Sequence, residues 1–487
     1  MPVDHSRASV AFRCDAGAEV GAGHVMRCMA GAEMFAWANW DVRICTSATG
    51  LPAASALVDD RFEVTSDSDW WSQARVAVLD SHRLDSRELL GAQRSGTTTV
   101  VFEDQPNRDI HADILVDPTP NRDPEAYRAY LRQHALLLVG VSYAQLGVAW
   151  RQMRAKVSGD HFARKDVERI VVSLGATDPY NLTCKVLQGL KESGYKGPTD
   201  VVLSVLAPHI DKVRELLGPN DTLHISPPDL PEIHAAADLA IGASGSSCFE
   251  RACIGIPSVA IPVVDNQSDL ASSFAARGAA EVVSRKILDE PRGLATVLRT
   301  LMHDAEKRAK LSSASREMVD GQGSRRLLIA AIGTATTKTG EVVGLRAGDL
   351  GDQNWLFALQ NQPETRRYAL NPDKPTFEAH CKWLASTLDN PDRLLAIVEV
   401  DRASVGMLRL DKETTAAQAS QFTISIAMDQ NFKRRGFAAA ALRLARRLTP
   451  GAEQVATVLE ENKASAALFM QAGFVQEGPS TFRMASA

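Results

Sequence analysis

Short apolar runs alternate with helix-like stretches over the first two thirds of the chain. The first series begins at residue 9 and ends near residue 149, with apolar runs at 10–12, 42–46, 76–79 and 98–102. A second series begins near residue 167, with runs at 170–174, 200–205, 239–242 and 258–261. Strands that alternate with helices predict a parallel sheet covered on both faces. We therefore expect two α/β lobes, the first over residues 9–150 and the second over residues 151–333.

The pattern changes near residue 332, where the polar stretch Gly333-Thr-Ala-Thr-Thr-Lys-Thr-Gly340 follows. Because a polar stretch of low hydrophobicity is typical of a connection, we interpret residues 334–341 as a linker. A third α/β unit is expected over residues 342–487, beginning with an edge strand at 342–346. Its further elements are a helical region to about 388, strands at 394–400, 406–410, 422–428 and 455–459, and helices at 438–448 and 464–472.

Composition narrows the class of protein without naming a reaction. A chain of 487 residues corresponds to roughly three domains. The formal charge of -5 and the lack of a long Lys/Arg run argue against nucleic acid or a membrane as a partner. The seven cysteines show no metal-ligand spacing, so we expect no metal. The sequence shows neither a signal peptide nor an apolar stretch long enough to span a bilayer, and we expect a cytoplasmic protein.

The first candidate site is the loop Gly21-Ala-Gly-His24, between the strand at 10–12 and a helix-like stretch. Glycine lets a ligand approach the backbone, and the N-terminus of a helix favours anions. A histidine at this place is a candidate general base, although a solvated or structural histidine is the alternative. Charged residues around the loop lie at the carboxyl end of a strand, where open α/β sheets bind ligands. The candidates are Arg13, Asp15, Gly21, Gly23, His24 and Arg27.

The second lobe carries two turns that follow strands. In the turn after the strand at 170–174, exposed amides and hydroxyls of Gly175, Thr177 and Asp178 could hold phosphate; a plain capped β–α turn is the alternative. The segment 237–262 predicts a strand, the turn Ser244-Gly245-Ser246-Ser247, a helix and another strand. The free amides at the start of this helix form a candidate anion site.

Glu250 lies about one turn inside the helix that follows Ser247. A carboxylate there can accept two hydrogen bonds from a ribose diol. Compensation of the positive end of the helix is the alternative role. Together with the turn, Glu250 predicts a nucleotide site on the second lobe.

The segment 237–262 resembles the donor-nucleotide site of GT-B-fold nucleotide-sugar enzymes, which implies two Rossmann-like lobes in a GT-B arrangement. Further motifs occur in the same order as in the UDP-2,4-diacetamido-2,4,6-trideoxy-β-L-altropyranose hydrolases of pseudaminic acid biosynthesis, which the chain resembles over roughly residues 9–333. These motifs are Arg13-x-Asp15, Gly21-x-Gly-His24-x-x-Arg27-Cys28, Phe102-Glu-Asp-Gln105 with Ala112-Asp-Ile-Leu115, Leu174-Gly-Ala-Thr-Asp178 and Val264-Asp-Asn-Gln267.

The resemblance implies hydrolysis at the anomeric carbon, with release of UDP and the free sugar. His24 matches the catalytic histidine of the family, as general base on water, and Asp15 would orient or polarise it. Asn266 and Gln267 match sugar-contacting positions. A diphosphate leaving group is already charged, so amides at a helix terminus can stabilise its departure without a metal. The chain departs from the family at Asp80-Ser81-His82, where Asp-x-Tyr is expected.

The third unit carries a basic, glycine-containing loop, Lys433-Arg434-Arg435-Gly436-Phe437-Ala438, between a strand and a helix. Successive amides and a helix N-terminus can hold a pyrophosphate, although a basic run is usually a solvated patch. With the segment Asn462 to Phe474, this loop resembles the GCN5-related N-acetyltransferases. The resemblance implies acetyl-CoA as co-substrate, bound by these six residues and Asn462.

Two further features bear on the acetyltransferase. Phe469 stands where the family has a tyrosine that protonates the leaving thiolate, and a phenyl ring cannot donate a proton. The residues 361–366 and His380 resemble acetyltransferases of the pseudaminic pathway that act on UDP-linked 4-amino sugars. His380 could be a substrate contact or base, or a half-buried helical histidine.

The two resemblances together predict a bifunctional enzyme. The C-terminal unit would acetylate the 4-amino group of a UDP-linked amino sugar with acetyl-CoA, and the two lobes would hydrolyse the product. Neighbouring enzymes of the same pathway are candidate partners. The alternatives are a GT-B glycosyltransferase, in which a sugar hydroxyl replaces water, and a degenerate acyl-CoA-binding module in place of the active acetyltransferase.

Overall fold

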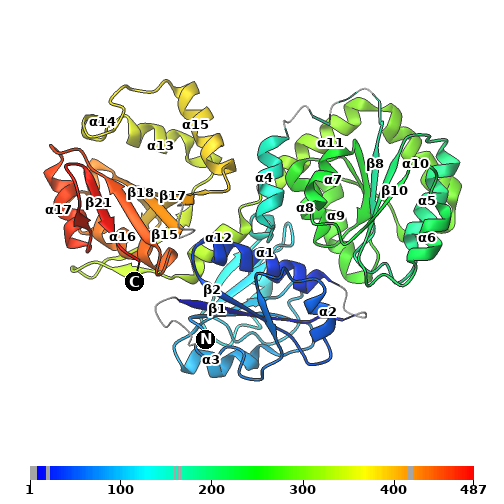
Figure 1. The fold of residues 1–487 in the computed structure, drawn as a ribbon, viewed down its shortest axis with the longest axis horizontal. Helices are drawn as coiled ribbons and strands as arrows, with labels where there is room; N and C mark the ends of the chain where they lie inside the picture. The colour runs from blue at the N-terminus through cyan, green and yellow to red at the C-terminus, as the bar shows by residue number, and fades with distance from the viewer. Residues whose placement is uncertain are drawn as a thin grey trace. The chain divides into compact units, whose positions relative to one another are not determined.

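The computed structural model describes residues 8–17, 22–157, 161–162, 164, 166–414 and 420–486. Its strands form three sheets, which Figure 1 shows with their helices. Residues 11–32 and 42–324 form one compact unit, and residues 33–41 join residues 325 onward in the other.

The first sheet has seven strands in the order β3-β2-β1-β4-β5-β6-β7. The strands are β1 (Ser9–Cys14), β2 (Asp41–Cys45), β3 (Glu63–Thr65), β4 (Val76–Asp80), β5 (Thr98–Phe102), β6 (Ile114–Asp117) and β7 (Leu136–Val139). The helices are α1 (Gly23–Trp37), α2 (Leu51–Ser55) and α3 (Leu90–Arg94), whereas α4 (Val148–Lys156) packs against the second lobe. Every residue of β4 is buried, as expected of a central parallel strand covered on both faces. The strand order reverses between β1 and β4, where ligands bind in open α/β sheets.

The second sheet has six parallel strands in the order β10-β9-β8-β11-β12-β13. The strands are β8 (Ile170–Ser173), β9 (Thr199–Leu203), β10 (Thr222–Ile225), β11 (Leu239–Ala243), β12 (Ser258–Ile261) and β13 (Glu281–Val282). The helices are α5 (Leu182–Ser193), α6 (Ile210–Leu216), α7 (Leu230–Ala236), α8 (Ser247–Ile254), α9 (Ser268–Ala276), α10 (Pro291–His303) and α11 (Ala305–Met318). The next helix, α12 (Gly323–Ala331), lies mostly in the C-terminal unit. Here the order reverses between β8 and β11, and both candidate turns of this lobe follow these two strands.

The third sheet has eight strands in the order β14-β15-β16-β17-β18-β19-β21-β20. The strands are β14 (Ala335–Thr336), β15 (Val342–Ala347), β16 (Arg393–Val400), β17 (Ala403–Thr414), β18 (Ser420–Met428), β19 (Glu453–Thr457), β20 (Val475–Gln476) and β21 (Thr481–Met484). The helices are α13 (Gln353–Gln360), α14 (Pro363–Arg367), α15 (Phe377–Asp389), α16 (Phe437–Leu448) and α17 (Lys463–Gln471). The parallel pairing of β18 with β19 covers only residues 421–423 and 453–455, so the two strands separate beyond Thr423.

The segment expected as a linker, residues 334–341, contains a strand. β14 pairs antiparallel with β15, and the amide of Thr337 donates to the carbonyl of Glu341 across a turn that contains Gly340 at a positive φ of 92°. The expectation of an edge strand at 342–346 is therefore wrong, because β15 lies between β14 and β16. Backbone pairing forms this hairpin, so its polar side chains give no apolar pattern to detect.

The end of α1 and the turn after it pack within the C-terminal unit. The indole N–H of Trp40 donates to the carbonyl of Leu448 at 3.0 Å, and the Trp37 ring meets the Phe422 ring edge-on at 5.3 Å. The apolar pattern places this helix in the first lobe. It does not reveal that the last turn of α1 packs in the core of the C-terminal unit.

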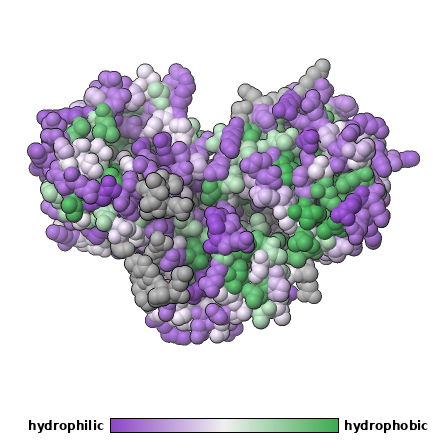
Figure 2. Space-filling view, viewed as in Figure 1, coloured by the Kyte–Doolittle hydropathy of each residue, from purple (hydrophilic) through white to green (hydrophobic). Residues whose placement is uncertain are grey.

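Among the described residues, no helix is both long and apolar enough to cross a membrane. The face of the molecule drawn in Figure 2 carries hydrophilic side chains over most of its area, with smaller hydrophobic groups between them.

Phe469, at the position of the missing tyrosine, belongs to an aromatic cluster of the C-terminal unit. Its side chain extends from α17 and is 3% exposed, with its ring centroid 5.0 Å from that of Phe474 and 6.2 Å from that of Phe482. Phe469 therefore stabilises the core.

We expect Phe469→Ala to lower the free energy of unfolding of this unit by about 3 to 5 kcal/mol, because it opens a cavity. Met470→Ala is the matched control, since Met470 is the next residue and 51% exposed; its effect should stay within about 0.5 kcal/mol. Urea-dependent hydrogen exchange of peptides from the C-terminal unit measures both. Equal losses of unfolding free energy in the two variants would contradict the stabilising role of Phe469 in the core.

Candidate functional site

His24 and Asp80 form a buried pair at the carboxyl edge of the first sheet. His24 lies in the first turn of α1, and Asp80 is the last residue of β4. Nδ1 of His24 lies 2.6 Å from Oδ1 of Asp80, and His24 is 7% exposed. When Nδ1 donates its proton to this carboxylate, Nε2 on the far side of the ring keeps a free lone pair. The pair can therefore act as an oriented general base.

Arg27 holds the same carboxylate from one turn further along α1. Its Nε donates to Oδ2 of Asp80 at 2.6 Å, and its Nη2 donates to Oδ1 at 2.5 Å. Burial alone would raise the pKa of Asp80, but the charges of Arg27 and His24 hold that pKa well below its usual range. Asp80 is therefore ionised at neutral pH and keeps the proton on Nδ1 of His24.

Asp80, not Asp15, is the carboxylate that contacts His24. Oδ2 of Asp15 accepts hydrogen bonds from the hydroxyl of Ser81 at 2.8 Å and from the amide of His82 at 3.2 Å. Asp15 thus shapes the loop after β4, which corrects the expectation that it orients His24. Both carboxylates follow adjacent strands, and one signal distinguished them: Asp80 closes a wholly apolar strand, so its charge required buried partners.

The loop after β4 adds a second histidine, His82, to the wall of the site. The rings of His24 and His82 meet edge-on with centroids 4.6 Å apart. Burial and the neighbouring His24 lower the pKa of His82. His82, Glu103 and Asp104 bring potential metal ligands within 4.8 Å of one another.

Cations already neutralise these carboxylates. Arg108 is hydrogen-bonded to Glu103, and Nη1 of Arg27 lies 3.9 Å from Asp104. We therefore assign no metal ion to this group.

The remaining candidates of the first lobe lie near this edge. Nη1 of Arg13 is buried and has no hydrogen-bond partner within the described part of the chain. A Cβ at Gly23 would meet no atom within 4 Å, so the backbone there faces open space. Gly21 lies outside the described residues.

In the turn after β8, Asp178 caps a helix. Its carboxylate accepts from the amides of Leu182 and Thr183, both at 2.8 Å, at the start of α5. The capped-turn alternative therefore describes Asp178, whose oxygens are engaged. Gly175 takes a positive φ of 99° with open space around it, and Thr177 is buried beside it.

The turn between β11 and α8 leaves the first helical amides without a side-chain cap. Ser246 is the N-cap and makes no capping bond, while Ser244 is fully buried. Gln267 lies against this turn, because a Cβ at Gly245 would stand 3.1 Å from its Nε2. The backbone of Asn266 belongs to the 3-10 turn Asp265–Gln267, and its side chain lies outside the described residues.

Glu250 extends from the first turn of α8 and is half-buried. Burial raises the pKa of Glu250 to about 7, against the opposing effects of Arg251 and a hydrogen bond from Trp150. This carboxyl group therefore titrates near neutral pH, which is unusual for an exposed acid and typical of a functional site.

The basic loop of the C-terminal unit ends in Gly436, which caps α16 at a positive φ of 82°. Lys433 pairs with Glu364 and Arg435 with Glu341, while Arg434 also takes a positive φ. Phe437 is buried and Ala438 lies in the first turn of α16. The loop therefore presents helix amides flanked by paired cations.

Two other candidates of this unit have structural roles. Oδ1 of Asn462 accepts from the amide of Ser465 at 3.1 Å and caps α17. His380 is buried on α15, and its Nε2 donates to the carbonyl of Gln353 at 3.0 Å. The buried-histidine alternative therefore describes His380.

Two family models match separate parts of the chain. The acetyltransferase (GNAT) domain model matches residues 343–475, and the glycosyltransferase family 28 C-terminal domain model matches residues 212–326. The second match contains the turn at Ser244 and Glu250.

Several known proteins are similar to parts of this chain. The spore coat polysaccharide biosynthesis protein SpsG of Bacillus subtilis is 28% identical over 200 residues, which are 40% of this chain and 58% of that protein. The UDP-N-acetylglucosamine–N-acetylmuramyl-(pentapeptide) pyrophosphoryl-undecaprenol N-acetylglucosamine transferase of Cutibacterium acnes is 32% identical over 113 residues, 22% of this chain and 30% of that enzyme. Among solved structures, MurG of Acinetobacter baumannii aligns with 66% of this chain and 98% of its own, at 16% identity and a TM-score of 0.46.

The chain thus spans little more than half the length of SpsG. It joins α/β lobes of the GT-B glycosyltransferase type to a GNAT acetyltransferase domain, for which acetyl-CoA is the co-substrate.

Proposed function

We propose that this chain is a bifunctional enzyme that acetylates a UDP-linked 4-amino sugar and hydrolyses the acetylated product to UDP and the free sugar. The product would be UDP-2,4-diacetamido-2,4,6-trideoxy-β-L-altropyranose, and the enzyme would act in the cytoplasm beside other enzymes of pseudaminic acid biosynthesis. The observation that carries the hydrolase proposal is the 2.6 Å contact between His24 and Asp80.

In the hydrolase step, Nε2 of His24 takes a proton from water while the water oxygen attacks the anomeric carbon. The bond between that carbon and the β-phosphate oxygen breaks, and its electron pair leaves with UDP. Asp80 stabilises the imidazolium that forms, and Arg27 keeps Asp80 ionised.

The nucleotide would bind to the second lobe. The first amides of α8 would hold the diphosphate, whose charge they stabilise as it leaves, and Glu250 would accept hydrogen bonds from the ribose diol. Gln267 beside the turn would contact the sugar. Asp178 is left out of this set because it caps α5.

In the acetyltransferase step, the amides at Gly436 and Phe437 would hold the pyrophosphate of coenzyme A. The 4-amino nitrogen of the sugar attacks the thioester carbon, the carbon–sulfur bond breaks, and the nitrogen loses one proton to water. Water returns a proton to the leaving thiolate, since Phe469 is buried and carries no acidic proton. The open strand edge beyond Thr423 offers backbone groups to the pantetheine chain.

A glycosyltransferase is the second candidate, favoured by the match to the glycosyltransferase family 28 C-terminal domain. It uses the same base and nucleotide site, but a sugar hydroxyl replaces water. Release of UDP from the UDP-sugar without an added acceptor supports the hydrolase, and strict dependence on an acceptor supports the glycosyltransferase.

We expect Asp80→Asn to slow UDP release by about 10²- to 10⁴-fold, because the amide favours the wrong tautomer of His24. His24→Ala should lose at least as much. Asp59→Asn, which alters an exposed aspartate paired with Arg61, is the matched control. Acetyl transfer should be unchanged in all three variants, and full UDP release in His24→Ala would contradict the mechanism.

We expect uridine to bind less tightly as the pH falls from about 8 to about 5.5, because Glu250 loses its charge in this range and then accepts fewer hydrogen bonds. The raised pKa of Glu250 also makes the carboxylate less favourable in the folded state, so this group's contribution to stability falls as the pH rises towards about 7. Glu250→Gln should bind uridine weakly and without this pH dependence. Calorimetry measures both, and a pH dependence that persists in Glu250→Gln would contradict the assignment.

We expect Glu364→Gln to tighten acetyl-CoA binding by about 2- to 5-fold, because it releases Lys433 from an exposed ion pair of small energy. Glu378→Gln is the control, since Glu378 forms a more exposed pair with Lys382 on α15. Titration calorimetry with acetyl-CoA measures the difference. An unchanged affinity in Glu364→Gln would show that Lys433 does not contribute to pyrophosphate binding.

A further inference from the structure

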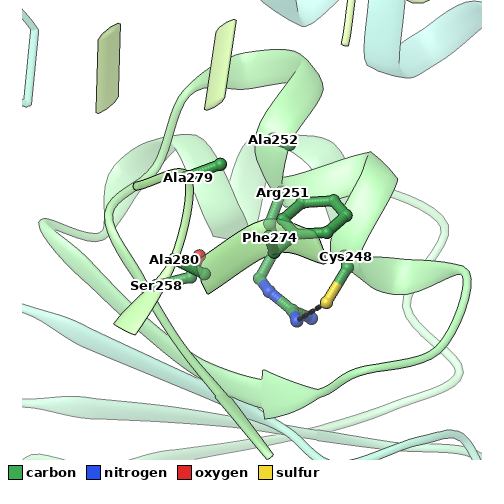
Figure 3. Close-up of a pocket in the computed structure, with 7 residues that line it drawn as sticks. All are labelled: Cys248, Arg251, Ala252, Ser258, Phe274, Ala279 and Ala280. Atoms are coloured by element: carbon green, nitrogen blue, oxygen red, sulfur yellow. Dashed lines mark hydrogen bonds between the residues drawn. The ribbon is translucent and has the colours of Figure 1, made fainter. Parts of the chain in front are cut away.

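Arg251 is a buried cation that makes no ion-pair contact with a carboxylate among the described residues of the nucleotide lobe, although the neighbouring Glu250 carboxyl interacts with it electrostatically. It extends from α8, is 1% exposed and points back toward the start of the helix. Its described acceptors are the carbonyl of Ala243 at 2.7 Å, the hydroxyl of Ser247 at 3.0 Å and the sulfur of Cys248 at 3.2 Å. Figure 3 shows the guanidinium beside Cys248. None of these acceptors is charged like a carboxylate, so burial of this cation is costly.

The lack of a side chain at Gly242 leaves space for this guanidinium. A Cβ at Gly242 on β11 would stand 2.4 Å from Nη1 of Arg251 and 2.7 Å from Cζ. Any larger residue at Gly242 would therefore displace the side chain. Phe274 and Ser258 line the small pocket around Arg251 (Figure 3).

The other arginines at α8 show why the position of Arg251 is unusual. At the C-terminus of the helix, Nη1 of Arg154 donates to the carbonyl of Cys253 at 2.8 Å, and Nη1 of Arg316 donates to that of Ile254 at 3.0 Å. Cations are favourable there, because the helix dipole is negative at that end. Arg251 instead places its charge near the positive end, where the carboxylate of Glu250 offsets it in part and a bound anion would offset it further.

We propose that Arg251 completes the binding site for the diphosphate of the UDP-sugar, an inference that rests on the proposed function. It is a positioning residue. Its bonds to Ala243 and Ser247 hold the turn so that the first amides of α8 face the phosphates. Its charge adds to the field of those amides without touching the ligand, and the bound diphosphate adds its negative charge to that of Glu250.

The test compares UDP with uridine on the full chain, by calorimetry, in wild type, Arg251→Met and Arg251→Lys. At about pH 9, where Glu250 is ionised, we expect Arg251→Met to weaken UDP binding by about 10- to 100-fold, because a buried charge acts strongly on a nearby anion, and uridine binding by less than about 2-fold. Arg251→Lys should recover part of the UDP affinity, because it keeps the charge. If the Arg251→Met variant does not fold, the Arg251→Lys variant provides the comparison with wild type.

Two controls separate charge from packing. Arg154→Met removes a cation from the other end of α8 and should not change the ratio of UDP to uridine affinity. Glu250→Gln should weaken both ligands by the same factor. Equal losses of affinity for UDP and for uridine in both Arg251 variants, or unchanged UDP binding in them, would overturn this inference and leave the proposed function intact. If wild type binds neither ligand, the proposed function fails, and this inference fails with it.

Discussion

The buried carboxylate of Asp80 is the group on which the first lobe and its chemistry both depend. It ends the central strand β4 and binds His24 and Arg27 from the first two turns of α1. The same bonds therefore join helix to sheet and orient the base. Because removal of one partner leaves a buried charge uncompensated, these contacts contribute to the stability of the lobe as well as to its reactivity.

The structure places its candidate anion sites at helix starts but supplies their charge differently. At α8, Arg251 is buried beneath the turn and makes no ion-pair contact within the described part of the chain. At α16, Gly436 opens the helix, and Lys433 and Arg435 lie on the surface in ion pairs with Glu364 and Glu341. A buried charge is weakly screened by salt, whereas exposed pairs are readily broken and reformed. The first arrangement suits a leaving group that must be stabilised, and the second suits a co-substrate that must exchange.

The apolar pattern predicted the class of fold and most central strands, because a buried parallel strand reads as a continuous apolar run. It missed short edge strands such as β13 and β14. Each has only two residues, which are too few to show the alternation of apolar and polar side chains typical of a strand. Motif and spacing located the loops of His24 and Glu250. They did not choose Asp80 over Asp15 as the partner of His24, because that depends on side-chain direction at adjacent strand ends; the available signal was the apolar strand that Asp80 closes. Asp178 and Asn462 likewise proved to be helix caps. A capping turn and a ligand-binding turn have the same local sequence, so the pattern could not distinguish them.

The most direct test of the central claim, attack of a His24-activated water on the anomeric carbon, uses the full chain with the UDP-linked diacetamido sugar in oxygen-18 water. Mass spectrometry of the products locates the label. Attack at carbon predicts one labelled oxygen in the free sugar and none in UDP. Label in UDP, which reports attack at phosphorus, or no reaction until a sugar acceptor is added, would contradict the claim.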